Sequence, residues 1–425
     1  MISAATRARE AWEGAESGKA SSEERSESSS GDGEGLTRTT SVGSEKKRLG
    51  ESGEAEDWEA REKRRRKGKH GKRREPGNGK ARAANAATLD DSARASPSSD
   101  AGEPIGKSAS MERGGILGAR VVVGAALAQG QRAYMEDRYS AVLDLKPDGM
   151  SECDGVRRSF LGVFDGHNGE WAAQFASERL HTFLDKEIVR SASPACPEAV
   201  EKYNEEMTRS LKKMYMDCDE VILDTTSSQG RRDGSTAVSI LQIGNVLFTA
   251  HAGDSRAVVG YSDGRTRAMT EDHKPSTMNE RRRITAIGGR IEFCGCWRVI
   301  ADHPYKPVRA ALAVSRSLGD IDFKRPTDTG VTAEPDINRF ELDENINFVI
   351  LATDGMWDVI RDQEAGDIAR AKLAECGVLT DGKCTTKDMS AVEEACKVAS
   401  QELLDTSLKR GTNDNVTVVV AMYMH

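Results

Sequence analysis

Residues 235–261 read STAVSILQIGNVLFTAHAGDSRAVVGY, and this stretch says most about the fold. Thr236–Ile243 and Val246–His251 are rich in apolar and β-branched residues. Gly244-Asn245, between them, is a two-residue sequence typical of a tight hairpin. A third run of the same kind, Ser255–Tyr261, follows after a short polar turn. Three such runs in succession predict neighbouring antiparallel strands.

Further strands and helices are predicted on both sides of this stretch. Strand-like apolar runs occur at four other places: Ala119–Leu127, Phe160–Phe164, Phe348–Thr353 and Val416–Met424. Apolar residues recur at helical spacing from Gly169 to about Lys186, over 200–214 and over 392–404. Because strands and helices fall in separate blocks, without strict βαβ alternation, the pattern predicts an α+β layered domain.

Composition divides the chain at one place. Residues 1–113 are rich in Ser, Gly, Glu, Lys and Arg and have almost no apolar periodicity. Such a segment buries too little apolar surface to offset its ordering entropy, so we expect a disordered tail. Residues 114–425 have regular apolar runs and are long enough for one sizeable core, which predicts a single folded domain.

Charge is distributed unevenly over these two parts. The chain has a formal net charge of −8, and residues 1–113 are nearly balanced, so the predicted domain carries the acidic excess. An acidic domain argues against nucleic acid as its main ligand. Residues 61–74 form a basic cluster. We weigh an import-receptor or polyanion-binding role for this cluster equally against a solvated charge run, and expect a cytoplasmic or nuclear protein.

The eight cysteines form no evident disulfide framework, and only Cys294 and Cys296 are close neighbours in the sequence. Two thiols alone are a weak indication of a site for a soft metal, and a redox-sensitive thiol is a second interpretation. We favour ordinary packed cysteines over both. No run approaches the roughly 18 apolar residues of a membrane helix. We therefore expect a soluble protein in a reducing interior, without a membrane partner.

Six short segments carry acidic residues, most of them beside a glycine or another small residue. These segments are Arg132–Asp137, Val163–His167, Ala252–Arg256, Ala313–Asp320, Ala352–Asp358 and Gly411–Asn415. Several follow an apolar run, and strand ends can deliver carboxylates to one shared point. Hard cations such as Mg²⁺ or Mn²⁺ bind oxygen ligands of this kind.

The residue types suggest chemistry for such a point. Asp165 is the best candidate to bridge two cations, because Gly166 lets a backbone carbonyl turn in as a further ligand. Arg132 would offer a planar donor set for phosphate oxygens. His167 is placed to protonate a leaving oxygen. Together these groups predict a metal-assisted phosphoester hydrolase with a metal-bridged water as nucleophile and no covalent intermediate.

The ordered set of motifs resembles the metal-dependent protein phosphatases of the PPM family, the type 2C serine/threonine phosphatases. The motifs are Arg132-x-x-Met135-Glu136-Asp137, Phe164–His167, Asp233–Ala237, Gly253–Arg256, Asp272–Pro275, Glu280-x-x-Arg283-Ile284, Gly288-Gly289, Leu312–Arg316, Glu334–Asp336, Asp354–Asp358 and Asp414-Asn415. The match spans about residues 120–423 in the family's order. Each motif alone is weak, and all of them together are very specific.

The resemblance implies a four-layer αββα sandwich, two antiparallel sheets flanked by helices, with the metals at one end. It implies that Glu136, Asp165 and the Gly166 carbonyl bind one Mg²⁺ or Mn²⁺, and that Asp165, Asp354 and Asp414 bind a second. A third, weaker metal in some members would fall on Asp254, Asp354 and Asp358. Substrates would be phosphoserine and phosphothreonine in proteins, and we expect a monomer.

The chain also departs from the family. Asn168 follows His167 where many members have a small residue, and residues 301–310 look like an insertion in the flap beside the active site. Cys294 stands where members that dock abscisic acid receptors have a tryptophan, so we do not assign that partner.

Simpler interpretations remain beside these. An isolated Asp-Gly is usually a turn, Asp320 is more readily structural than a ligand, and Trp171 and Trp357 are most simply core residues. An inactive phosphoprotein-binding scaffold of the same fold is the alternative function. The complete carboxylate set of Glu136, Asp165, Asp354 and Asp414 argues against it.

Overall fold

The structure is a computed structural model that describes residues 117–146, 155–190, 197–302 and 309–425. The described residues belong to one compact unit. Residues 1–116 lie outside these ranges. The disorder expected for 1–113, the role of the basic cluster 61–74 and the domain boundary at 114 therefore stay predictions.

Two five-stranded antiparallel sheets form the centre of the fold. The first sheet has the order β1 (Arg120–Ala128), β18 (Val416–Met424), β15 (Ile346–Ala352), β8 (Arg256–Tyr261) and β9 (Thr266–Ala268). The second has the order β14 (Asp336–Glu341), β7 (Val246–Ala252), β6 (Ala237–Ile243), β3 (Arg158–Phe164) and β2 (Arg138–Val142). The hairpin predicted at Gly244-Asn245 is confirmed as the β6–β7 connection.

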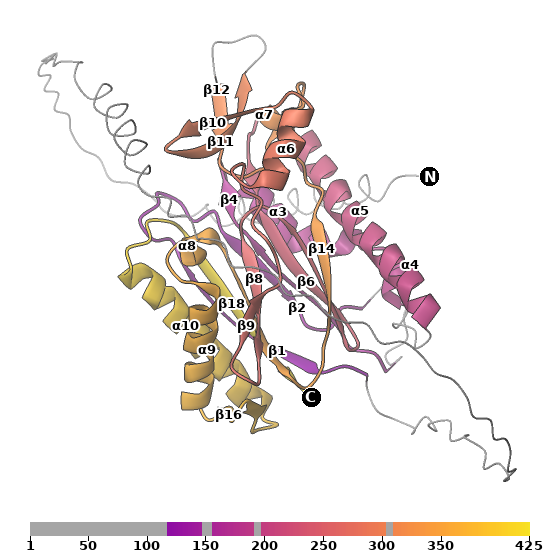
Figure 1. The fold of residues 1–425 in the computed structure, drawn as a ribbon, viewed down its shortest axis with the longest axis vertical. Helices are drawn as coiled ribbons and strands as arrows, with labels where there is room; N and C mark the ends of the chain where they lie inside the picture. Colours follow the sequence, from indigo (N-terminus) through magenta and orange to yellow (C-terminus); the bar gives the residue numbers. More distant parts are fainter. Residues whose placement is uncertain (1–116, 147–154, 191–196, 303–308) are drawn as a thin grey trace, which may run out of the picture. The chain divides into compact units, whose positions relative to one another are not determined.

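Helices cover the outer face of each sheet, as Figure 1 shows. On the first sheet, α9 (Asp362–Glu375) and α10 (Met389–Lys409) share an apolar core with β15 and β18. On the second, α3 (Trp171–Arg179) and the long α5 (Pro197–Gln229) share a core with β3, β6 and β7. A third core between the sheets contains Leu161, Val238 and Val419. The α+β sandwich predicted from the sequence is therefore confirmed.

The predicted strands correspond closely to β1, β3, β15 and β18, whereas one helix prediction was partly wrong. The expected helix from Gly169 to about Lys186 ends at Arg179. A 3₁₀ turn, η1 (Leu180–Phe183), and a separate α4 (Lys186–Arg190) follow it. The side chain of Asp185 accepts hydrogen bonds from the backbone N–H groups of Glu187 and Ile188. This capping begins a new helix, which apolar spacing alone does not reveal.

A smaller subdomain, the flap, lies beside the sandwich near the top of Figure 1. It contains α6 (Met278–Ala286), β10 (Arg290–Cys294), β11 (Cys296–Asp302), β12 (Arg309–Leu312) and α7 (Ile321–Lys324). Ile284, Val299, Leu312 and Phe323 belong to its own apolar core. The predicted insertion at 301–310 coincides with the β11–β12 connection, and residues 303–308 lie outside the described ranges.

The remaining elements are short. Strands β4 (Gly166–His167), β5 (Gly234–Ser235) and β13 (Leu318–Gly319) form a small sheet, β16 (Leu379–Thr380) pairs with β17 (Lys383–Cys384), and α8 (Asp354–Trp357) follows β15. No helix within the described ranges is both long and apolar enough to cross a membrane.

Candidate metal and phosphate site

The register of the second sheet brings three acidic segments to one end. Arg138 of β2 is opposite Phe164 of β3, so Glu136 and Asp165 lie just beyond the same edge. Val163 of β3 is opposite Val238 of β6, and Ala237 of β6 is opposite Ala252 of β7. Asp254 therefore follows β7 at this end as well.

The first sheet contributes the other acidic segments at the corresponding end of its strands. Ala352 of β15 is opposite both Val418 of β18 and Arg256 of β8. Asp354 comes just after β15, and Asp414 comes just before β18. Asp254 lies between β7 of one sheet and β8 of the other, so it connects the two halves of the site. We call Glu136, Asp165, Asp254, Asp354 and Asp414 the carboxylate cluster.

Four members of the cluster, Asp165, Asp254, Asp354 and Asp414, lie close enough together for their charges to interact. Burial raises the pKa of Asp165 well above its ordinary value. The charge of Asp137 raises it further, followed by those of Asp354, Asp254 and Asp414. The pKa of Asp354 is raised by burial and then by the charges of Asp254, Asp358 and Asp414. Carboxylates that face one another out of water need a cation or a proton to stabilise them.

Two basic side chains pair with the cluster. Arg132 Nη2 lies 2.5 Å from Asp414 Oδ2, and the Arg132 side chain is 57% exposed. Lys274 Nζ lies 3.1 Å from Asp254 Oδ2 and 4.0 Å from Asp358 Oδ1. Sequence analysis did not give Lys274 a role, although it belongs to the Asp272–Pro275 motif. Its ammonium lies between two of the three carboxylates expected to hold the weaker third metal.

Glu136 and Gly166 are fixed by the backbone around them. Glu136 Oε1 accepts a hydrogen bond of 2.7 Å from Gly169 N, and its own backbone N–H donates to Asn415 Oδ1 at 2.8 Å. A Cβ atom at Gly166 would lie 2.4 Å from the Glu136 carbonyl oxygen, so this approach requires glycine. Asn415 Nδ2 also donates to the carbonyl oxygens of Gln129 and Tyr134. Asn415 therefore positions the segment that carries Arg132 and Glu136.

His167 has a carboxylate partner that sequence analysis did not identify. Its Nε2 lies 2.9 Å from both oxygens of Asp320, which is itself 2% exposed. Burial lowers the pKa of His167, but Asp320 outweighs burial and the net pKa is raised. Ser317 Oγ donates to Asp320 Oδ2 at 2.6 Å and holds that carboxylate in place. The pair joins residues 153 positions apart, which periodicity alone cannot predict.

The turn after His167 explains the unusual Asn168. Asn168 has φ 58° and Gly169 has φ 134°. Asparagine is one of the few residues other than glycine that adopt the left-handed conformation readily, so Asn168 suits this place. Trp171 and Trp357 are each 7% exposed and belong to the apolar cores, as expected.

The chemistry of the cluster fits a hard divalent cation. Its donors are carboxylates and a backbone carbonyl, the ligands that Mg²⁺ and Mn²⁺ prefer, and their mutual repulsion would be relieved by positive charge. Within the described ranges, no three His, Cys, Asp or Glu side chains are arranged so that they could hold a metal ion together. The ion pairs with Arg132 and Lys274 account for the present orientation of Asp414 and Asp254.

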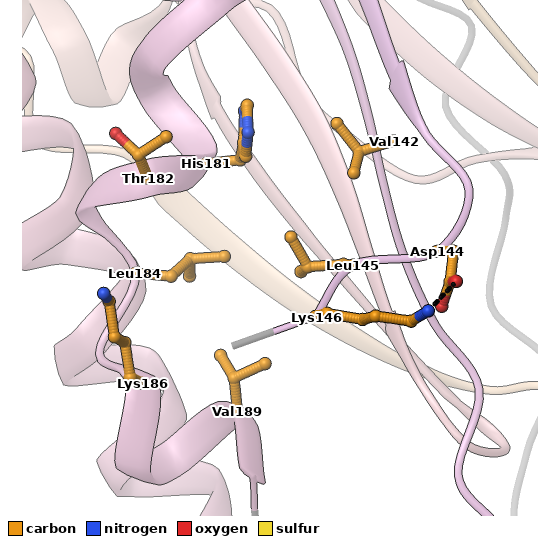
Figure 2. Close-up of a pocket in the computed structure, with 9 residues that line it drawn as sticks. All are labelled: Val142, Asp144, Leu145, Lys146, His181, Thr182, Leu184, Lys186 and Val189. Carbon is orange, nitrogen blue, oxygen red and sulfur yellow. Dashed lines mark ion pairs between the residues drawn. The ribbon is translucent and has the colours of Figure 1, made fainter. Parts of the chain in front are cut away.

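A separate cavity of about 350 Å³ lies at the other end of the β2–β3 pair, between β2, η1 and α4. Figure 2 shows its lining, with Leu145 and Leu184 directed inward and Lys146 paired with Asp144 at 2.8 Å. Val142 in this lining is opposite Phe160, four residues before Phe164 on β3. The cavity is thus separate from the carboxylate cluster.

The sequence model of the family described as Protein phosphatase 2C matches residues 122–416, the span that contains the carboxylate cluster, Arg132 and His167. The chain belongs to the protein phosphatase 2C family. Probable protein phosphatase 2C 52 from Oryza sativa subsp. japonica is 33% identical over 300 residues, covering 70% of this chain and 49% of that relative. Probable protein phosphatase 2C 30 from Arabidopsis thaliana is 33% identical over 295 residues, covering 69% and 64%. The match thus spans about half to two-thirds of these relatives.

Solved structures with the same fold include one from this family. A serine-threonine phosphatase 2C from Toxoplasma gondii has a TM-score of 0.54 and 24% identity, covering 71% of this chain and 94% of that chain. A C. elegans sex determining protein also has a TM-score of 0.54, with 25% identity and coverage of 72% and 65%. The family resemblance predicted from the motifs is confirmed, and with it the sandwich fold of a protein phosphatase 2C.

Proposed function

We propose that this protein is a metal-dependent phosphatase that hydrolyses phosphoserine and phosphothreonine in proteins. The observation that carries the proposal is the carboxylate cluster at the shared end of two sheets. There the charges of Asp254 and Asp354 raise the pKa of Asp165, and the charge of Asp254 raises that of Asp354. A structural role would favour paired carboxylates, because unpaired buried charge costs several kcal/mol per ion. Such a cluster is therefore better explained as a binding site for cations.

Glu136, Asp165 and the Gly166 carbonyl would hold one divalent cation, and Asp165, Asp354 and Asp414 a second. Asp254, Asp354 and Asp358 would hold a weaker third one, in competition with Lys274. Bound Mg²⁺ or Mn²⁺ supplies Lewis acidity toward phosphate oxygens and lowers the pKa of a water molecule. The family implies a dependence on divalent metals in general; the number of ions and their identity belong to the proposal.

Arg132 would bind the phosphate ester, and His167 would protonate its leaving oxygen. The guanidinium of Arg132 is exposed beside the cluster, so it can reach phosphate oxygens and exchange its pairing with Asp414 for one with substrate. His167 would donate its proton to the leaving oxygen of serine or threonine. Asp320 favours the protonated form of His167 and orients its ring, which makes Asp320 a positioning residue.

The test is phosphate release from a phosphothreonine peptide by the full chain, with Mg²⁺ or Mn²⁺ and then with EDTA. We expect release that requires either metal and disappears with EDTA. A well-folded protein that binds the peptide without releasing phosphate would overturn the proposal and favour the inactive scaffold. Arg265→Ala is a suitable control, because Arg265 is an exposed arginine paired with Asp263 in the β8–β9 turn, outside both the cluster and the flap.

A further inference from the structure

The turn of the β10–β11 hairpin carries two thiols that face each other. Cys294 is directly opposite Cys296 in the antiparallel register, with only Gly295 between them. Gly295 has φ +82°, the left-handed conformation that glycine adopts readily. Both cysteines are exposed. Among the cysteines that the structure describes, these are the two that pair with each other across a β-ladder.

The spacing of this pair is close to that of a disulfide. Residues directly opposite on antiparallel strands have Cβ atoms about 4.5–5.5 Å apart, and a disulfide needs about 3.5–4.5 Å. A modest closure of the turn is therefore sufficient. No atom beyond the neighbouring residues lies within 4 Å of a Cβ position at Gly295, so the turn has space in which to adjust.

The surroundings distinguish these two thiols from the others described. Arg309 on β12 lies near enough to Cys294 for their charges to interact. Cys218 and Cys396 are buried, and burial raises the pKa of both thiols, that of Cys396 to about 12. Cys384 is exposed but is opposite Leu379. Accessible and mutually opposed thiols are thus combined at this turn.

We propose that Cys294 and Cys296 form a reversible dithiol–disulfide site that is oxidised by hydroperoxides. The Cys294 thiolate attacks a peroxide oxygen, the O–O bond breaks, and hydroxide leaves a sulfenic acid on Cys294. The Cys296 thiolate then attacks the sulfenic sulfur, so that the S–S bond forms and the S–O bond breaks. The sulfur atoms lose two electrons in total, and hydrogen peroxide and the two thiol protons become two waters. A disulfide in so small and exposed a ring is of the readily reduced kind.

The test uses the full chain, treated with limiting hydrogen peroxide and then with an alkylating reagent. Cleavage after Arg290 and Arg298 releases Ile291–Arg298, which contains these two cysteines and no others. We expect this fragment to lose the mass of two hydrogen atoms and to resist alkylation. Dithiothreitol should restore both alkylation sites. Because phosphate release is not measured, a negative result here leaves the proposed phosphatase activity untouched.

Matched variants make the result specific. In Cys294→Ser the fragment should keep one alkylatable thiol and form no internal disulfide, whereas Cys376→Ser, at an exposed cysteine outside the hairpin, should behave as the unmodified chain. Trp297 adjoins the pair, so its fluorescence should fall on oxidation and recover on reduction; Trp297→Phe should abolish that change. Sulfinic acid on either cysteine without the disulfide, or disulfides that link Cys294 to another cysteine, would refute the proposal.

Discussion

Two regions of the molecule bury acidic side chains in opposite ways. In the carboxylate cluster, Asp165 and Asp354 face other carboxylates, and their pKa values are raised first by burial and then by those neighbours. At the junction of α6 with the segment before α7, Glu280 is also buried, yet it lies between Arg283 and Arg316. We call Glu280, Arg283, Arg316 and Asp336 the arginine network.

The arginine network is fully paired. Glu280 accepts hydrogen bonds from Arg283 at 2.6 Å, Arg316 at 2.8 Å and Ser315 at 2.6 Å. Burial alone would raise the pKa of Glu280, but these donors outweigh it and lower the pKa to about 2. Arg316 also pairs with Asp336 at 2.7 Å, and thereby ties the flap to β14.

The contrast separates a structural role from a functional one. Both regions hold carboxylates at least partly out of water, with Glu280 buried and Asp165 and Asp354 half-buried, so composition alone does not distinguish them. What differs is the sign of the neighbouring charge. Positive neighbours stabilise the carboxylate in the arginine network, whereas negative neighbours repel the carboxylates in the cluster. The carboxylate cluster therefore carries negative charge that a bound divalent cation would neutralise.

The largest effect is expected from Asp165→Asn. Removing one carboxylate takes away the proposed bridging ligand, so metal-dependent phosphate release should fall to background. The same change relieves repulsion with Asp354 and Asp254, so the free energy of unfolding should not decrease. Peptide hydrolysis checks the expected loss of activity, and urea denaturation checks the expected free energy of unfolding. Retained turnover would remove Asp165 from the metal site.

In the arginine network we expect a substitution to lower the stability of the fold, which is the reverse of the result expected for Asp165→Asn. Arg316→Leu leaves Glu280 buried with Arg283 and Ser315 but one fewer partner, which should lower the free energy of unfolding by about 1–3 kcal/mol. Arg309→Ala, which breaks exposed pairs with Glu292 and Asp302, is the matched control and should change it by less than about 1 kcal/mol. If urea denaturation shows the same loss of unfolding free energy for both variants, burial of the Arg316–Glu280 pair does not contribute to stability.

The pH dependence of stability should reflect two groups, Glu280 in the arginine network and the nearby His251. The pKa of Glu280 is lowered to about 2, so its contribution is present above about 4.5 and is lost as pH falls toward 2. Burial and His273 lower the pKa of His251 to about 4, so the unfolded chain binds its proton first and stability falls from pH 6.5 to 4. Each group gives a slope of at most about 1.4 kcal/mol per pH unit. Denaturation of Glu280→Gln, with a flatter curve below pH 4.5, checks the first assignment.

A further test concerns the partner of the proposed acid. Asp320→Asn keeps the size of the side chain but removes its charge, so kcat for a phosphothreonine peptide should fall about 10–100-fold. An aryl phosphate has a better leaving group that needs less protonation, so the loss should be smaller with that substrate. A merely structural defect would reduce both rates alike.

The smallest effect is expected at the exposed edge of the cluster. Arg132→Ala should raise KM for a phosphopeptide about tenfold, equivalent to about 1.4 kcal/mol, because the guanidinium is proposed to bind phosphate. Arg132→Lys should recover part of that loss, since the charge remains but the planar pair of donors does not. An unchanged KM would leave Arg132 as no more than the partner of Asp414.

The sequence by itself determined the strands around Gly244-Asn245, the class of fold and the family, because runs of apolar and β-branched residues and the order of motifs can be read along the chain. It also placed Asp165, Asp254 and Asp354 directly after strands. The break after Arg179 was missed, since the capping by Asp185 is a local contact that apolar spacing does not register.

Only the tertiary structure decided which charges meet. The register of the two sheets brings Asp254 beside Asp354, and the same packing sets Lys274 on Asp254, Asp320 on His167 and Arg316 on Glu280. These partners are far apart in the chain, and side-chain chemistry alone allows each carboxylate either a metal or an arginine. Ion pairs and metal ligation both require contacts of a few ångströms, so the choice between them is made by packing.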